Sequence, residues 1–215
     1  TGWYTLSLHD ALPISWLGGV TANDTNGGPV TSLTGSPGLV LGTHFTESST
    51  IPGQYGVNLS SLVANASQNG VLLVCGAKNE DNFALSRANA NGTFTIHCHD
   101  NGNDGNDHEP DPVAFVYLPK SSIGTAGLTA LGRVNGDAST DISAGNFTMT
   151  KAGTGKWKLV VTGHSDATGT LIVSPEGGDA NNVDNIVSSE WDADNGWWII
   201  TSRDLPNATL QNMSE

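Results

Sequence analysis

Short apolar runs recur along the chain, and none of them has the period of an amphipathic helix of useful length. The main runs are residues 71–75, 93–98, 113–118, 157–162 and 198–201. They are rich in β-branched and aromatic residues, which favour strands, and they are bounded by Gly, Asn, Asp or Pro. Asn-Gly pairs, which form tight hairpin turns, recur along the chain, among them those at 69–70, 91–92, 135–136 and 195–196. The pattern predicts an all-β fold of the sandwich or barrel type.

Alternation within residues 93–100 predicts which side chains of this strand face the core. Successive side chains of a strand point to opposite faces, so Phe94, Ile96 and Cys98 share one face while Thr93 and His97 share the other. We expect the set that contains Phe94 to point inward, because it is the more apolar of the two.

The second half of the chain repeats the landmarks of the first half in the same order. The matched segments are 55–59 with 157–161, 70–74 with 169–173, 81–82 with 184–185, 91–92 with 195–196, and 94–100 with 198–204. The last pair aligns without a gap, so Trp198, Ile200 and Ser202 take the inward parity. This repeat predicts two tandem antiparallel β-sandwich modules related by internal duplication.

The repeat also sets the expected domain boundaries. The first module should cover residues 38–119, a linker 120–132, and the second module 133–215, with 16–37 as the remnant of a preceding segment or linker. In the first module an acidic loop leads into the apolar run 113–118, and no such run follows in the second module before Glu215. We therefore expect the second module to be truncated and to lack its last strand.

The first fifteen residues are excluded from this interpretation. Residues 5–15 resemble the translation of a common short-read sequencing adapter over eleven consecutive positions. We treat residues 1–15 as a sequencing artefact, because such scars carry no information about the fold.

The composition of the chain argues against nucleic-acid binding and against a membrane span. The chain of 215 residues has 21 acidic and 8 basic side chains, a formal net charge of −13. A nucleic-acid partner is not expected, because phosphate binding needs clustered Lys and Arg. A membrane span is not expected either, because no apolar run approaches the length of about 20 residues that crosses a bilayer.

The two cysteines occur in only one copy of the repeat. Cys75 falls opposite Ser174 and Cys98 opposite Ser202, so both cysteines are replaced together. This paired replacement predicts a Cys75–Cys98 disulfide, which would suit an oxidising compartment outside the cytoplasm, and the alternative is two independent buried thiols. Zinc binding at Cys98 is disfavoured, because His97 projects to the opposite face and no CxxC pair exists.

The acidic loop at 100–111 is the strongest local cluster of potential ligands. Asp100, Asp104, Asp107 and Asp111 supply the hard oxygen atoms that Ca²⁺ prefers, so a calcium site is one interpretation and a solvated polar turn is the other. An EF-hand is excluded, because Gly102 stands where an oxygen ligand is required. No other cofactor is expected.

Catalytic chemistry has little support in the sequence. His97, His99 and Asp100 could hold a metal or move protons, but the second copy has Thr201 and Arg203 at the histidine positions and keeps only the aspartate, as Asp204. The cluster at 163–167 contains Ser, His and Asp on one turn, which cannot adopt the geometry of a catalytic triad. We do not expect an enzyme.

Two tryptophans suggest a ligand-binding surface. Trp197 has outward parity, and we expect Trp191 to lie in the preceding loop, beside Asn and Asp residues. Exposed aromatic rings in such surroundings can stack on sugars, whereas the alternative is that Trp197 packs against a neighbouring module or loop.

The composition of these tandem β modules resembles that of the repeats of large secreted or cell-surface bacterial proteins. The modules are rich in Gly, Asn and Asp, and the chain has few lysines and a low pI. The resemblance implies an extracellular or cell-surface location and a non-catalytic role in spacing, adhesion or display. Alternatives are a carbohydrate-binding β-sandwich module, with polysaccharide or another surface component as partner, and an accessory domain of a secreted hydrolase.

Overall fold

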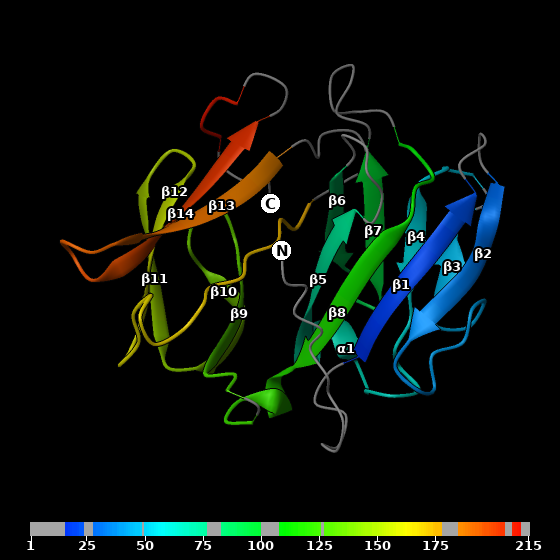
Figure 1. The fold of residues 1–215 in the computed structure, drawn as a ribbon, viewed down its shortest axis with the longest axis horizontal. Helices are drawn as coiled ribbons and strands as arrows, with labels where there is room; N and C mark the ends of the chain where they lie inside the picture. Colours follow the sequence, from blue (N-terminus) through cyan, green and yellow to red (C-terminus); the bar gives the residue numbers. More distant parts are fainter. Residues whose placement is uncertain are drawn as a thin grey trace, which may run out of the picture.

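The fold is all-β, and its strands form antiparallel sheets (Figure 1). The computed structural model describes residues 16–23, 28–48, 50–76, 83–99, 108–125, 127–177, 185–204 and 208–211, with side chains from Ser32 onward. Within these residues the helices are the single turns α1 (Ala66–Asn69) and η1 (Lys120–Ser122). None of the described helices is long and apolar enough to cross a membrane. The expected all-β class is confirmed.

Two four-stranded sheets make up the first half of the chain. One has the order β2-β1-β8-β5, from β1 (Trp16–Asn23), β2 (Gly28–Gly35), β5 (Gly70–Gly76) and β8 (Val113–Pro119). The other has the order β3-β4-β7-β6, from β3 (Phe45–Glu47), β4 (Gln54–Val57), β6 (Phe83–Ala88) and β7 (Phe94–His99). Both sheets contribute side chains to one buried apolar cluster.

The alternation expected for β7 is confirmed. Phe94, Ile96 and Cys98 are all buried in this cluster. From the other sheet, β8 supplies Phe115 and Tyr117, and the Phe94 and Tyr117 rings meet edge to face at a centroid distance of 5.9 Å. These inward side chains place His97 and His99 on the outer face of β7, because they have the opposite parity.

The second half contains a four-stranded sheet and a separate two-stranded sheet. The larger sheet has the order β11-β12-β14-β13, from β11 (Phe147–Gly153), β12 (Lys156–Val161), β13 (Asn185–Asp192) and β14 (Trp197–Asp204). The smaller pairs β9 (Ala130–Val134) with β10 (Thr140–Gly145). Trp157, Leu159, Trp198 and Ile200 form the buried cluster of this half, and Ser202 is buried as expected.

The larger sheet of the second half has the same strand order as β3-β4-β7-β6 in the first. Corresponding residues also form the same pairs: Tyr55 faces Ile96, and Trp157 faces Ile200. Two backbone hydrogen bonds follow the same alignment of the two sheets. The N–H of Cys98 donates to the carbonyl of Gly53 at 2.8 Å, and the N–H of Ser202 donates to the carbonyl of Gly155 at 2.9 Å.

Chain segments return to the same strands in both halves. His108 forms an antiparallel bridge with His99, and Leu210 forms one with Arg203. The next residue along each segment donates its N–H back to the preceding strand position, Glu109 to Cys98 at 3.0 Å and Gln211 to Ser202 at 3.3 Å.

Three segments differ from their expected roles. Residues 16–37, expected to precede the first module, contain β1 and β2, and β1 pairs with β8 inside the first sheet. The expected linker 120–132 contains η1 and the start of β9. Residues 169–173, expected to match β5, form no strand, although Leu171 and Val173 pack on the second core while Ile172 is 70% exposed.

The two halves contact each other directly. Val71 of β5, Leu131 of β9 and Ile142 of β10 form a small shared apolar cluster. Beside it, the Ala88 N–H donates to Glu176 Oε1 at 2.9 Å. This contact joins the end of β6 to a segment of the second half.

Candidate functional site

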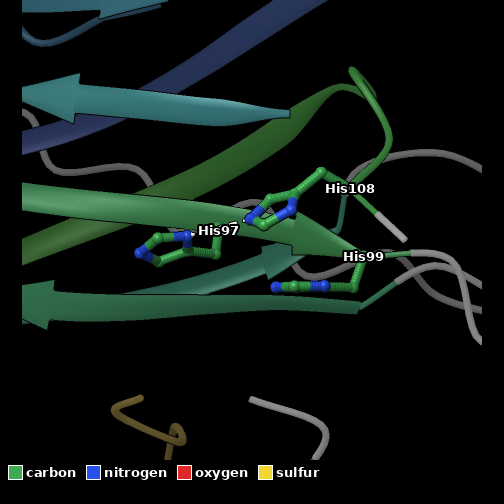
Figure 2. A group of neighbouring side chains, drawn as sticks. All are labelled: His97, His99 and His108. Atoms are coloured by element: carbon green, nitrogen blue, oxygen red, sulfur yellow. Dashed lines mark hydrogen bonds between the residues drawn. The ribbon is translucent and has the colours of Figure 1, made fainter. Parts of the chain in front are cut away.

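Three histidines meet at the end of β7, as Figure 2 shows. One ring nitrogen from each of His97, His99 and His108 lies within 4.8 Å of those of the other two. His97 Nδ1 and His108 Nε2 form a hydrogen bond of 3.2 Å. The His99 and His108 rings lie closest, with centroids 4.3 Å apart.

Strand geometry explains how these side chains come together. His97 and His99 are two residues apart on one strand, so they project from the same face. His108 lies nine residues further on, but its antiparallel bridge to His99 brings its side chain to the same end of β7.

The site is largely removed from solvent. His97 and His99 are buried, with exposed fractions of 1% and 0%, and His108 is half-buried. The ring of Phe83, on the neighbouring strand β6, stacks on His99 with a centroid distance of 5.5 Å. Neither ring nitrogen of His99 has a hydrogen-bond partner among the described residues.

Burial determines the charge state of His99. Its pKa is lowered to about 4, first by desolvation and then by the neighbouring His108 and His97 rings. A neutral imidazole keeps a lone pair on one ring nitrogen, and that lone pair is what a metal ion binds. Three such rings within reach of one point can therefore hold a transition-metal ion.

The sequence alone points to two of these three residues. It marks His97 and His99 as potential metal ligands but not His108, because nothing in the sequence indicates that the chain folds back on β7 at residue 108. One usable signal is the aligned segment of the second half, in which Thr201 and Arg203 stand at the positions of the first two histidines.

The residues proposed for calcium lie elsewhere or outside the described chain. Asp100, Asp104 and Asp107 fall outside the described residues. Asp111 is only 2% exposed, and its backbone carbonyl accepts a hydrogen bond of 2.9 Å from the Tyr55 hydroxyl.

The predicted Cys75–Cys98 disulfide is wrong, because both cysteines are free thiols. Cys98 points into the core from β7, whereas Cys75 is exposed on β5. The parity of β5 explains the difference: Leu72 and Val74 pack against the core, so Cys75 projects from the opposite face.

The two tryptophans considered for sugar binding have different surroundings. Trp191 lies on strand β13 rather than in the expected loop, because it pairs with Trp198 of β14. Its ring packs edge to face on that of Trp198, with centroids 4.5 Å apart, and contacts the second core. Trp197 carries the Lys158 ammonium group over its ring, 4.2 Å from the centroid. Lys158 therefore covers one face of the Trp197 ring.

A largely apolar cavity of about 360 Å³ lies between the two halves. One wall comes from the first half, including Leu72 and Leu118. The others come from β9, residues 168–174 and core side chains of the larger sheet in the second half, among them Trp157 and Trp198. In the part of the chain that the structure describes, β9 pairs only with β10, so its other edge has no strand partner.

Comparisons with known proteins give no relative from which a function could be transferred: no family model, no curated protein and no solved structure matches this chain.

Proposed function

We propose that this chain is a non-catalytic structural segment of a secreted or cell-surface protein, built from two copies of one antiparallel β-sandwich module. Its role would be spacing, adhesion or display. One observation carries the proposal: the sheets β3-β4-β7-β6 and β11-β12-β14-β13 share both strand order and pairing register.

A shared register is a demanding criterion for duplication. Shifting a strand by one residue would move its whole apolar set to the other face of the sheet. Here the pair Val57 and Phe94 corresponds to Leu159 and Trp198, and all four side chains are buried. The backbone bonds of Gly53 and Gly155 agree with the same alignment.

Acidic composition is consistent with an exposed structural role. A net charge of −13 opposes self-association of the chain and favours solubility. Many kinds of protein have a negative net charge, so the charge alone does not identify a structural role.

Duplication makes a prediction about the cavity between the two halves. In the first half β8 lies between β1 and β5, and it fills the core with Val113, Phe115 and Tyr117. If β9 corresponds to β1 and residues 169–173 to β5, the cavity beside them corresponds to the position of β8.

A synthetic peptide with the sequence of residues 109–119 tests this correspondence. We expect it to bind the full chain, to change the fluorescence of the tryptophans that line the cavity, and to slow hydrogen exchange at the free edge of β9. The matched control is the same peptide with Phe115 and Tyr117 both replaced by Ser, which keeps the backbone but removes the core side chains. Equal binding of the two peptides, or binding of neither, would remove the duplication on which the structural role rests.

A further inference from the structure

We propose that His97, His99 and His108 form a binding site for one divalent transition-metal ion of the zinc type. The three imidazoles would be its protein ligands, and a remaining coordination position would stay open to solvent or to a small ligand. The geometry that carries this inference lies in the first half alone, and only the comparison with Thr201, Arg203 and Leu210 below rests on the proposed duplication.

The spacing of the ligand atoms suits such an ion. Zinc binds histidine nitrogen at about 2.0–2.1 Å in tetrahedral geometry, so the ligand nitrogens are separated by roughly 3.4 Å. His97 Nδ1 and His108 Nε2 are already 3.2 Å apart, and all three ligand atoms lie within 4.8 Å. Ion binding would require the third nitrogen to move closer to these two by side-chain rotation.

His99 provides the independent indication of a ligand. Buried polar atoms nearly always have partners, because desolvating them without a compensating interaction is unfavourable. The His99 ring is fully buried, and neither of its nitrogens has a hydrogen-bond partner among the described residues. A metal ion would supply that partner while the ring stays neutral.

Binding requires a change of tautomer at the pair that is now hydrogen-bonded. One proton lies between His97 Nδ1 and His108 Nε2 in the metal-free protein, so one of these nitrogens is a donor. For both to bind a metal, that proton must move to the other nitrogen of its own ring, which leaves each imidazole neutral. No net proton release is needed for this step.

The second half indicates that the fold does not itself require these histidines. At the three corresponding positions it has Thr201, Arg203 and Leu210, within the same strand pairing and the same bridge. The three histidines are therefore present together in one copy and absent together from the other, as expected for residues that act as one ligand set.

The ligand types decide the class of ion. Imidazole suits Zn²⁺, Cu²⁺ and Ni²⁺, whereas Mg²⁺ and Ca²⁺ prefer oxygen ligands. The described cluster consists of imidazole nitrogens only. His108 is half-buried, which leaves a route from solvent for the ion.

The test uses the full chain after treatment with a chelator and dialysis. Titration calorimetry with Zn²⁺ should show one ion bound per chain with a dissociation constant in the micromolar range or below. Co²⁺ should produce the intense visible absorption bands of a tetrahedral nitrogen site. Saturating Zn²⁺ should raise the melting temperature by on the order of 5 °C.

Two variants locate the ion. His108→Gln removes the half-buried ligand and should weaken Zn²⁺ binding at least tenfold while leaving the metal-free circular dichroism spectrum and melting temperature near those of wild type. His164→Gln, at a turn of the second half, is the matched control and should bind Zn²⁺ as wild type does. Ca²⁺ at the same concentration controls for non-specific attraction to the acidic chain and should give none of these effects.

Several results would overturn the assignment. These are the absence of Zn²⁺ binding at 100 µM-scale concentrations, about a hundredfold above the expected dissociation constant, an unchanged affinity in His108→Gln, or a loss of binding in His164→Gln. If His108→Gln fails to fold, His97→Gln and His99→Gln are measured by the Co²⁺ spectrum, and wild-type bands in both would likewise contradict the site.

Discussion

The face of a strand on which a side chain lies determines its chemistry in this protein. Cys98 and His99 are adjacent on β7, yet the thiol lies in the apolar core and the imidazole lies in the histidine cluster. Burial raises the pKa of Cys98 to about 12, and the charge of Asp111 adds to this effect. Cys75, in contrast, is exposed to solvent on β5.

Thiol reactivity should therefore separate the two cysteines. In native protein without reductant at pH 8, a thiol reagent such as Ellman's should modify Cys75 quickly and leave Cys98 unmodified, because thiolate is the reactive species. Denaturation should raise the count from one thiol to two. The Cys75→Ser variant is the control, and it should show no reactive thiol until it unfolds. No reactive thiol in unreduced, denatured wild type would instead demonstrate a disulfide.

At the scale of elements, glycines set the geometry where the chain enters β4 and β12. Gly53 and Gly155 both have positive φ, 72° and 61°, which disfavours a residue with a side chain. Both also lie against other backbone: a Cβ at Gly53 would be 2.4 Å from the Glu109 carbonyl oxygen, and one at Gly155 would be 2.7 Å from that of Ser202. These contacts hold the returning segments against the turns.

Substitution of Gly53 should consequently be more damaging than substitution at a glycine with a similar φ in open space. Gly42 has a φ of 80°, and a Cβ added there would have no atom within 4 Å. Gly42→Ala should therefore lower the free energy of unfolding by about 1 kcal/mol, because only the unfavourable backbone conformation opposes the new side chain. Gly53→Ala adds overpacking against backbone and should cost about 1–3 kcal/mol more. Urea unfolding of both variants measures the difference, and equal destabilisation would show that the turn relaxes around the new methyl group.

Strands with a strong apolar pattern are predictable from the sequence, and those that depend on neighbours are not. β7, β8, β12 and β14 coincide with expected runs because each carries core side chains in alternation. Residues 169–173 have a comparable pattern but form no strand, because a strand also needs a hydrogen-bonded partner. The half-exposed strand β13 is not predicted from the sequence, because it has no continuous apolar run. It forms a strand through its hydrogen-bonded pairing with β14.

The histidine cluster is predictable only in part, for a related reason. The His97-x-His99 spacing is local, and strand alternation alone places both rings on one face. The contribution of His108 depends on a tertiary bridge across nine residues, which the sequence does not encode as a recognisable pattern. The disulfide prediction is wrong because replacement of two cysteines together does not determine the faces from which they project.

For the whole molecule, the contact between the halves combines apolar packing with a partly buried charge. Glu176 accepts from the Ala88 N–H at 2.9 Å and lies 3.6 Å from Arg133 Nε, and Arg133 also donates to the Ser67 carbonyl at 2.7 Å. Desolvation raises the pKa of Glu176 above its ordinary value, despite the opposing effects of Arg133 and of the Ala88 N–H. Ionisation of Glu176 is therefore unfavourable in the folded state relative to the unfolded chain.

The sign of this shift predicts how stability should change with pH. A carboxyl group with a raised folded-state pKa contributes its full stability below the unfolded value, about 4.5, and loses it as the pH rises through the folded value. Glu176→Gln keeps an acceptor for the Ala88 N–H but cannot ionise, so wild type should lose stability relative to this variant between pH 4 and pH 7. The difference should stay below about 1 kcal/mol, because the Glu176 side chain is 33% exposed and solvent screens its charge.

Urea unfolding of both proteins at the two pH values measures this difference in the free energy of unfolding. Glu190→Gln on β13 is the control for loss of one negative charge. A relative gain of wild-type stability with rising pH would show instead that the Arg133 ion pair outweighs desolvation at the contact between the halves.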